Sequence, residues 1–219
     1  MHPTPSTPPP LFAQYPIRSL GAGHRRRIAA HLLTLDPADR YLRFGYAAGD
    51  AQIRRYVQSI DFKSDDVFGV YNRRLGLLAV AHIAYAHSQA CGSCAEFGVS
   101  VLRRARGRKL GKRLFERAIT HARNQGVTLL FIHALTENTP MLAIAAQAGA
   151  TLERDGSETE AHLRLPPANL DTVLSELVQE RLAQTDYSLK AQAQAFRRVL
   201  ATLQEIRSGV QHARNQSAP

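Results

Sequence analysis

The sequence has no long apolar run, and it contains few cysteines and few acidic residues. No hydrophobic segment approaches the roughly 20 residues that a membrane-spanning helix needs, although 44% of the 219 residues are hydrophobic. The first ten residues, MHPTPSTPPP, lack the basic and apolar regions of a secretion signal. These absences argue against a membrane protein and against export, so we predict a globular cytoplasmic protein.

Cysteine is limited to Cys91 and Cys94, which are separated by two residues. This CxxC spacing is typical of zinc and redox sites, but a structural zinc site usually needs four ligands. The nearest further candidates, His82 and His87, precede the same turn. The other interpretation is a hairpin loop, 88–94, that happens to contain two thiols. We predict this loop and no bound metal.

Acidic residues are outnumbered, with 18 Asp and Glu against 28 Lys and Arg, for a formal net charge of +10. The last segment, 166–219, contains six basic and five acidic residues, so nearly all of the excess lies before it. A basic surface favours negatively charged partners. If the protein is an enzyme, its charge mildly favours an acidic or neutral substrate over a polycation.

Proline divides the chain into three parts. Five of the first ten residues are proline, so we predict that residues 1–13 form an arm without a fixed fold. The pair Pro166 and Pro167 marks a second boundary. Residues 14–165 are sufficient for one domain with a substantial core, and residues 166–219 form a C-terminal helical extension.

The apolar pattern predicts an α/β fold of the α+β type, because strand-like alternation and helix-like spacing both occur. The expected strands are 14–20, 66–71, 75–87, 95–102, 128–134, 150–154 and 159–165. The expected helices are 25–34, 50–60, 110–124 and 140–148, followed by one long or two shorter helices in 166–219. This order favours a mixed, mostly antiparallel sheet flanked by helices, plus the C-terminal helices.

The stretch 96–111, EFGVSVLRRARGRKLG, is the most informative part of the chain. A strand runs into a turn with seven Lys or Arg residues in the eleven positions 103–113, and a helix follows directly. The first amides of a helix have no partners within it, and the helix dipole adds roughly half a positive charge there. The pattern predicts an anion site for a ligand that carries phosphate.

Two other kinds of site share this composition. A P-loop requires GxxxxGK followed by Ser or Thr, but Gly107 and Gly111 are one residue too close together, and Arg113 occupies the hydroxyl position. A nucleic-acid-binding surface explains the arginines but neither the glycines nor the preceding strand. Nucleic-acid binding by 103–113 is therefore kept as an alternative, and the leading hypothesis has no nucleic-acid partner.

The turn resembles a known motif. The segment 106–111, RGRKLG, is similar to the coenzyme A diphosphate motif [RQ]xxGx[GA] of the GNAT superfamily of N-acetyltransferases. Lys109 stands where that family usually has its first glycine. If this position requires a positive φ, a lysine there is strained by about 1 kcal/mol or more. The preceding strand, with Val99 and Val101, resembles the family's pantetheine-binding strand.

Further matches lie on both sides of the turn. Asn138 to Met141, NTPM, followed by Gly149 and Ala150, resembles the family's NxxA…GF segment, from which Met141 and Ala150 depart. Residues 40–44, RYLRF, resemble a segment near the start of one branch of the superfamily. The resemblance covers roughly residues 14–165. In the resembled fold the fourth and fifth strands diverge, and acyl-CoA lies between them.

The resemblance implies an acyl-CoA-dependent N-acyltransferase that uses acetyl-CoA as co-substrate. The acceptor would be a primary amine, either of a protein lysine or of a small molecule, attacking the thioester directly in a ternary complex. Val99 and Val101 are expected to bind the pantetheine through their backbone. The other residues expected to bind the cofactor are Arg106, Gly107, Arg108, Lys109, Leu110, Gly111, Lys112 and Asn138. As the first residue before a predicted helix, Asn138 is equally suited to capping it.

Transfer to an amine requires the removal of a proton. A lysine-like amine is neutral in only about one molecule in 2,500 at pH 7, a penalty of roughly 4.6 kcal/mol. Glu96 is the predicted general base, because Ala95-Glu96-Phe97 resembles the AEF segment that holds a catalytic glutamate in protein-acetylating members of the family. The other interpretation of Glu96 is a solvated or arginine-paired residue. His133 is a candidate acid or second base, against the interpretation of a buried structural histidine.

Two departures from the resembled family leave a second hypothesis open. Ala145 stands where the family commonly has a tyrosine that assists the departing thiolate, and losing a general acid typically costs something like 10²- to 10⁴-fold in rate. Together with Lys109, this suggests a catalytically weak acyl-CoA-binding regulatory module as an alternative. The apolar residues of 166–219 predict packing on the same domain or on a second copy, which would form a homodimer, or else a docking surface for another protein.

Overall fold

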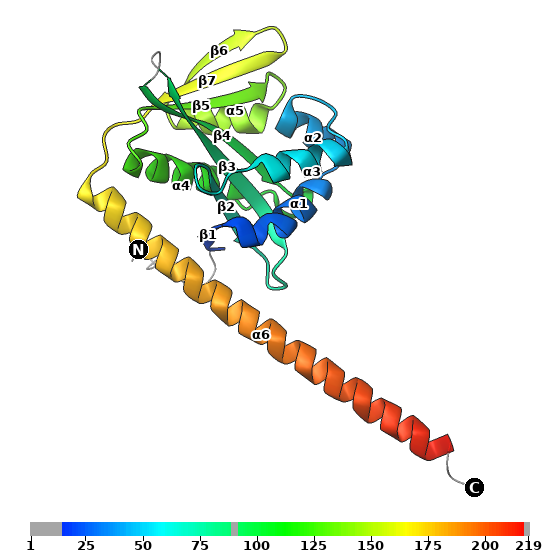
Figure 1. The fold of residues 1–219 in the computed structure, drawn as a ribbon. Coiled ribbons are helices and arrows are strands. Elements are labelled where there is room, and N and C mark those ends of the chain that lie inside the picture. Colours follow the sequence, from blue (N-terminus) through cyan, green and yellow to red (C-terminus); the bar gives the residue numbers. More distant parts are fainter. Residues whose placement is uncertain (1–14, 89–91, 217–219) are drawn as a thin grey trace, which may run out of the picture.

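In the computed structural model, which describes residues 15–88 and 92–216, seven strands form a single mixed sheet (Figure 1). The strand order is β1-β2-β3-β4-β5-β7-β6, and all neighbours are antiparallel except the parallel pair β4 and β5. The strands are β1 (Ile17–Ser19), β2 (Asp66–Tyr71), β3 (Leu77–Ser88), β4 (Gly92–Val101), β5 (Leu129–Leu135), β6 (Thr151–Asp155) and β7 (Glu158–Arg164). This confirms the predicted fold class.

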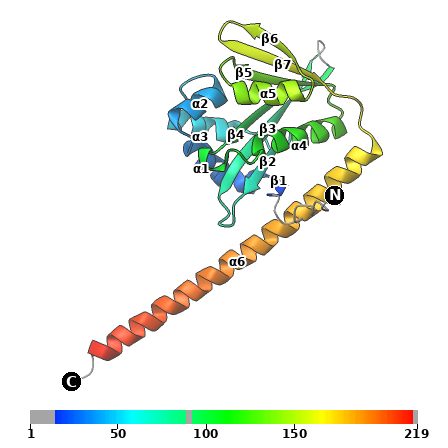
Figure 2. The same cartoon turned by 180° about the vertical axis from the view of Figure 1, so that it is seen from behind.

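Helices cover both faces of the sheet (Figures 1 and 2). The helices are α1 (Arg25–Leu33), α2 (Pro37–Phe44), α3 (Asp50–Ser59), α4 (Leu110–Asn124), α5 (Thr139–Gln147) and α6 (Leu170–Gln216). Helices α4 and α5 pack on one face over a core that includes Phe97, Leu114 and Phe115. Helices α1 and α3 pack on the other face over a second core that includes Ile53 and Val57.

The helix boundaries follow from local signals in the sequence. Asp36 caps α2 by accepting a hydrogen bond from the backbone N–H of Asp39 at 2.8 Å, and Pro37 occupies the first turn. Gly45, with a φ of 77°, ends α2 in the left-handed conformation that glycine adopts without strain. These signals were overlooked in the sequence, where no helix was expected over 37–44.

The pairing of β4 with β5 is short. Only three residue pairs connect the two strands, namely Cys94 with Leu129, Ala95 with Leu130, and Glu96 with Phe131. Beyond Glu96, β4 continues to Val101 on β3 alone. The predicted divergence of the fourth and fifth strands is therefore present, and it opens a fork whose apex is at Glu96.

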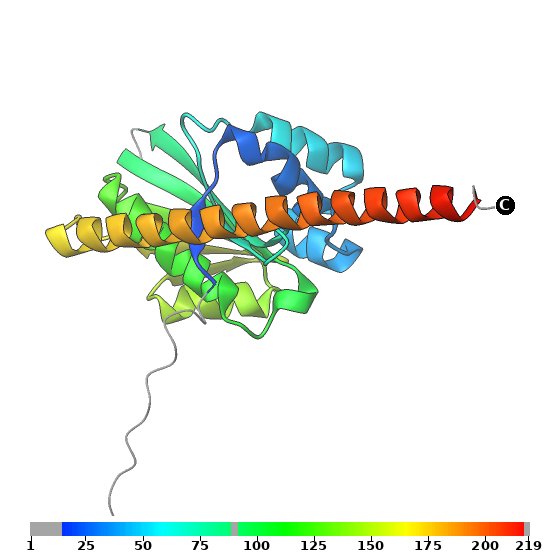
Figure 3. The same ribbon diagram turned by 90° about the horizontal axis from the view of Figure 1, so that it is seen from below.

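The C-terminal extension is one continuous helix, α6, so of the two alternatives that the sequence left open, one long helix is correct and two shorter helices are not. Figure 3 shows that α6 crosses the sheet at β1 and then continues beyond the domain. Glu180 of α6 accepts a hydrogen bond from the Ser19 hydroxyl at 2.7 Å, and Tyr187 contacts the Arg27 guanidinium at 2.6 Å. These contacts attach the first half of α6 to the edge strand β1 and to helix α1.

Two other sequence expectations concern segments that the structure does not fully describe. The Pro-rich arm 1–13 and Cys91 lie outside the described residues. Cys94 is buried in β4. Within the described residues, no group of three or more His, Cys, Asp or Glu side chains is placed to hold a metal ion, and no helix is long and apolar enough to cross a bilayer.

Candidate active site

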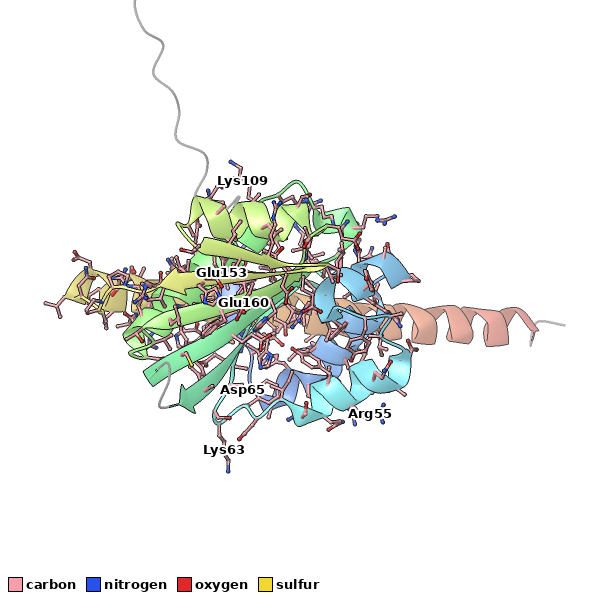
Figure 4. The ribbon with its side chains drawn as sticks, turned by 90° about the horizontal axis from the view of Figure 1, so that it is seen from above. Arg55, Lys63, Asp65, Lys109, Glu153 and Glu160 are labelled. Atoms are coloured by element: carbon pink, nitrogen blue, oxygen red, sulfur yellow. The ribbon has the colours of Figure 1, made fainter. Side chains whose placement is uncertain are left out.

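An open cleft of about 1170 Å³ occupies the fork between β4 and β5. One end of the cleft is formed by the turn before α4, and the other by the hairpin of β6 and β7. In the view of Figure 4, Glu153 and Glu160 of the hairpin lie between Lys109 and Asp65. The cleft lining is basic at the turn, with Lys109 and Lys112, and mainly acidic at the hairpin, where four carboxylates outnumber Arg154. Such a charge distribution suits a pair of ligands of opposite charge.

The turn before α4 presents backbone donors to the cleft. Gly107 and Lys109 both have positive φ angles, of 75° and 57°. Alternation of left-handed and ordinary residues makes a concave nest of N–H groups that binds anions. Within the described part of the chain, the N–H groups of residues 107 to 112 make no hydrogen bond. Lys109 therefore adopts the left-handed backbone conformation that favours glycine. A positive φ is the condition under which the sequence predicts strain at this lysine.

The arginines of the turn have partners inside the protein. Arg103 pairs with Asp36 at 2.8 Å, and Arg106 pairs with the buried Asp39. Arg108 contacts the Tyr15 hydroxyl and is not part of the cleft lining. The carboxylates of Asp36, which caps α2, and of Asp39 in α2 therefore relieve part of the repulsion within the arginine cluster. The sequence did not indicate these two pairs.

The remaining predicted residues of the phosphate end lie in the cleft lining. They are Val99 and Val101 of β4, Gly107, Lys109, Leu110, Gly111 and Lys112 of the turn and helix, and Asn138. Lys112 also contacts the side-chain oxygen of Gln147 at 3.3 Å. Asn138 caps α5 through a 3.4 Å contact with the Met141 N–H, and its amide donates to the Leu42 carbonyl at 3.3 Å. The side-chain oxygen of Asn138 is therefore used in capping α5, and its side-chain NH2 group is bonded to the backbone of α2.

Glu96 stands at the apex of the fork. It is exposed, lines the cleft, and faces Phe131 in the last β4–β5 pair. Because side chains alternate along a strand, Glu96 lies on the face opposite Phe97, which packs against Phe115 of α4. None of the described side chains forms an ion pair with Glu96, so the interpretation of an arginine-paired residue has no support.

His133 lies in the cleft wall, where its side chain is 56% exposed. The interpretation of a buried structural histidine is therefore wrong. Its Nε2 lies 3.7 Å from Glu160 Oε1, and His133 and Glu160 face each other on β5 and β7. Glu160 in turn faces Glu153 on β6, and two residues further along the hairpin Asp155 faces Glu158, with the pair Arg154 and Thr159 between them.

These two pairs put four carboxylates on one side of the hairpin. Glu153, Asp155, Glu158 and Glu160 all line the cleft. Like charges directly opposite each other on paired strands destabilise a sheet. His162 Nε2 lies 3.9 Å from Glu153 Oε2 and 3.7 Å from Glu160 Oε2, and a further cation near this wall would relieve the remaining repulsion. The sequence did not indicate this wall, because it depends on the register of β6 against β7.

A second polar group near the apex was also missed. The side chains of Arg43 and Tyr56 line the cleft, and the Arg43 Nη2 atom donates to the Tyr56 hydroxyl at 2.8 Å. The same hydroxyl lies 2.8 Å from Nδ1 of His82 on β3. Burial, followed by the charge of Arg43, lowers the pKa of His82 below its ordinary value of 6.5. His82 is therefore neutral near pH 7.

Comparison with known proteins connects this geometry to a family. Residues 50–150 match the profile of the Acetyltransferase (GNAT) family. No curated protein sequence matches the chain. The GNAT domain of S. lividans PAT has a similar structure, with a TM-score of 0.57 and 19% identity over 68% of this chain and 89% of that one.

Two more solved structures have the same fold at low sequence identity. An acetyltransferase of the GNAT family from Streptococcus pneumoniae has a TM-score of 0.54 and 12% identity, over 68% of this chain and 98% of that one. Spermidine N-acetyltransferase from Vibrio cholerae, solved in complex with CoA and spermine, has a TM-score of 0.52 and 15% identity, over 68% and 94%. At such identities the likeness shows the fold alone.

Proposed function

We propose that this chain transfers the acetyl group of acetyl-CoA to a primary amine, because residues 50–150 match the profile of the Acetyltransferase (GNAT) family. One observation carries the proposal: a single cleft joins unpaired backbone N–H groups at 107–112 to the carboxylate of Glu96 at the apex of the strand fork. An acyltransferase needs both, an anchor for the diphosphate and a base near the thioester.

The basic end of the cleft fits the coenzyme. The N–H groups of the turn and the N-terminus of α4 would bind the diphosphate, because both direct partial positive charge at an anion. Lys109 and Lys112 line the same end and would add charge. Beyond Glu96, the backbone of β4 at Val99 and Val101 no longer pairs with β5, so a pantetheine arm with its amides could lie along it.

Glu96 is proposed as the general base. The acceptor arrives largely as an ammonium ion and must lose a proton before its nitrogen can attack. The exposed carboxylate of Glu96 can accept that proton directly or through one water, and the solvent can then take it away. The acetyl group would lie beside Glu96 if the pantetheine follows β4 from the turn to the apex of the fork.

The acidic end of the cleft narrows the class of acceptor. The net charge of the whole protein favours an acidic or neutral acceptor, but the four carboxylates of the β6–β7 hairpin favour a positively charged acceptor. Local charge matters more, because salt screens distant charges within about 8 Å at physiological ionic strength. We therefore propose a cationic amine, such as a polyamine or a lysine in a basic peptide segment.

The substitution Glu96→Gln tests the reaction. We expect acetyl-CoA to raise the melting temperature of the wild type and of this variant equally, because the carboxylate is not at the phosphate end. Turnover with an amine should fall by roughly 10²- to 10⁴-fold, measured as release of free thiol. Glu137→Gln, an exposed residue outside the cleft lining, is the matched control.

Each outcome of that experiment has a distinct meaning. Full turnover in Glu96→Gln would remove this residue from the mechanism. Thermal stabilisation by acetyl-CoA without transfer to spermine, a blocked lysine peptide, kanamycin or glutamate would support the alternative of a binding module. The absence of any effect of acetyl-CoA would overturn the proposed function.

The acidic wall is tested with the double substitution Glu153→Gln and Glu160→Gln. With spermine as acceptor, KM should rise roughly 3- to 30-fold, as expected for two partly exposed charge pairs, while KM for acetyl-CoA stays unchanged. Asp171→Asn, exposed on α6, controls for the loss of charge alone. An unchanged KM for spermine would show that the acceptor binds elsewhere.

A further inference from the structure

A chain of four polar side chains reaches the cleft next to the apex of the fork. Arg43 of α2 donates to the hydroxyl of Tyr56 of α3 at 2.8 Å, and this hydroxyl lies 2.8 Å from His82 Nδ1. On its other side, His82 Nε2 lies 3.2 Å from Asp65 Oδ2, close enough for an electrostatic interaction but without the geometry of a hydrogen bond. The chain therefore runs from a buried imidazole to a phenol that faces the cleft.

The position of this chain is set by Gly98 on β4. A side chain at Gly98 would meet the Arg43 guanidinium, because a Cβ atom there would lie 2.5 Å from Nη2. Glu96 and Gly98 share a face, and residues two apart on a strand are about 6.6 Å apart. His82 faces Gly98 across the β3–β4 pair. The Tyr56 hydroxyl is thus brought to the same stretch of β4 as the proposed base.

The direction of the hydrogen bonds follows from the charges around His82. The groups that act on its imidazole are Arg43, Tyr56, Asp65 and Glu96. The carboxylate of Asp65 lies nearest Nε2 and favours the proton on that nitrogen, which leaves a lone pair on Nδ1. Tyr56 then donates its proton to Nδ1 and accepts one from Arg43. One lone pair of the phenol oxygen is left to accept a proton from a ligand in the cleft.

We infer that Tyr56 is a catalytic group of the proposed acetyl transfer, accepting a proton from the acceptor nitrogen while passing its own to His82. The inference rests on the proposed function. Asp65 and Arg43 are positioning residues: the charge of Asp65 favours the His82 tautomer that is protonated on Nε2, and Arg43 holds the phenol against β4. On α5, the buried Ala145 has no hydroxyl to contribute. Of the two tyrosines in the cleft lining, Tyr46 and Tyr56, it is Tyr56 that is bonded to the Arg43 guanidinium beside Gly98.

The proton balance needs two sites. Acylation of a protonated primary amine removes two protons from nitrogen, one before the attack and one as the amide forms. Glu96 takes the first and passes it to solvent. As the carbon–nitrogen bond forms and the carbon–sulfur bond breaks, the second proton moves to the Tyr56 oxygen, and the phenol proton moves to His82 Nδ1. A proton then returns from His82 Nδ1 to the Tyr56 oxygen, and the Tyr56 hydroxyl gives a proton to the departing thiolate. The products are therefore the amide, the thiol and one released proton.

Tyr56→Phe tests this role, because it removes only the hydroxyl. The ring should keep its contacts with Phe44 and His82, whose centroids are 5.3 and 5.9 Å away. With acetyl-CoA and spermine, we expect kcat to fall about 10²-fold or more, with KM for acetyl-CoA and the melting temperature unchanged. Tyr41→Phe, on the exposed side of α2 and outside the cleft lining, should behave like the wild type.

A relay also predicts non-additivity. His82→Gln should lower kcat by a similar factor, and the double variant Tyr56→Phe, His82→Gln should be little slower than either single variant, because both interrupt one path. If the loss of kcat in the double variant equals the product of the losses in the two single variants, Tyr56 and His82 have independent roles. Wild-type kcat in Tyr56→Phe would overturn the inference and leave the proposed function standing, whereas an inactive wild type would overturn both.

A second measurement does not depend on turnover. In protein labelled with nitrogen-15 histidine, the signal assigned to residue 82 through His82→Gln should be that of a neutral ring protonated on Nε2. Tyr56→Phe should shift its Nδ1 resonance, because a hydrogen bond to that atom is lost. A proton on Nδ1 in the wild type would reverse the hydrogen bond to Tyr56, leave His82 unable to accept, and overturn the inference.

Discussion

At the scale of single residues, the turn before α4 combines two left-handed positions with different side chains. Gly107 adopts its φ of 75° without strain, and a Cβ there would meet no atom within 4 Å. Lys109 adopts a φ of 57°, which costs an L-residue roughly 1–2 kcal/mol. The protein therefore keeps a strained lysine at the end where the diphosphate is proposed to bind, a location where strain commonly has a functional role.

Lys109→Gly and Gly107→Ala should therefore change stability in opposite directions. Lys109→Gly relieves strain, partly offset by the greater freedom of glycine in the unfolded chain, and should stabilise by up to about 1 kcal/mol. Gly107→Ala introduces strain and should destabilise by about 1 kcal/mol or more. For a chain of this size, 1 kcal/mol shifts the melting temperature by roughly 2–4 °C. Thermal melts of both variants decide this, and shifts of the same sign would contradict the strain at residue 109.

At the scale of elements, the attachment of α6 to α4 depends on a cluster of charged side chains. His121 of α4 lies between Asp66 of β2, 2.8 Å from Nε2, and Glu176 of α6, which contacts Nδ1. Arg117 contacts the same Glu176 carboxylate at 2.6 Å. Burial opposes the charge of His121, but the hydrogen bonds to Asp66 and Glu176 outweigh it and raise the pKa of His121 to about 9.

The free energy of unfolding should therefore depend on pH, because pH sets the charges of His121 and Glu176. A raised histidine pKa stabilises the fold fully below about pH 6.5, and that contribution disappears as the pH rises through about 9. Burial opposes ionisation of Glu176 too, yet its bond with His121 lowers its pKa to about 2. Its contribution is present above about pH 4.5 and is lost as the pH falls toward 2. The cluster should be strongest between about pH 4.5 and 6.5.

His121→Gln tests the pH dependence. The wild type should melt at a higher temperature than the variant at pH 6, and the difference should shrink as the pH approaches and passes 9. His133→Gln, at an exposed position on β5, controls for the loss of a histidine. Parallel melting curves for wild type and His121→Gln across this range would exclude the cluster as the cause.

The helices and strands could be predicted from the sequence where a local pattern within one segment was sufficient. Apolar alternation placed β2 and β7, and the spacing of Leu110, Leu114 and Phe115 placed α4. The free N–H groups of the turn also followed from local pattern. The acidic wall did not, because alternation tells which face a residue occupies but not which residue of the next strand it meets. Glu153 and Glu160 become opposed only through the register of β6 and β7.

The same limit applies to the polar chain at Tyr56. Its four residues come from α2, α3, β3 and the loop before β2, and no local pattern brings them together. Helix α2 itself was missed, although Asp36, Pro37 and Gly45 are ordinary start and stop signals. Roles for Glu96, His133 and the turn residues stay predictions, as does the domain boundary near residue 165.

At the scale of the whole molecule, α6 exposes apolar residues on the sides that do not contact the domain. The domain-facing side carries Glu176, Glu180 and Tyr187. The exposed apolar residues of α6 are Leu170, Val173, Leu174, Leu177, Val178, Leu182 and Leu189. A contiguous apolar surface of this kind commonly marks an interface, and the predicted homodimer through the C-terminal helix would cover it.

Homodimerisation can be measured directly. We expect light scattering after gel filtration to give the mass of a dimer that dissociates on dilution. Leu174→Glu with Val178→Glu, one helical turn apart, should give a monomer at every concentration, because charges would enter the interface. Gln179→Glu, also exposed, should not. A monomeric wild type would disprove the homodimer and leave the apolar face without an assigned partner.

The three-pair connection between β4 and β5 also has a consequence for how the chain folds. Strands β2 to β4 form a meander of local hairpins, and β6 and β7 form another hairpin. The parallel connection can form only after α4 has crossed over between its strands, and such non-local pairing is slow because loop closure comes first. The two halves of the sheet are therefore expected to assemble separately and to join last at Glu96, so that the fork is both the last part of the sheet to form and the first to loosen.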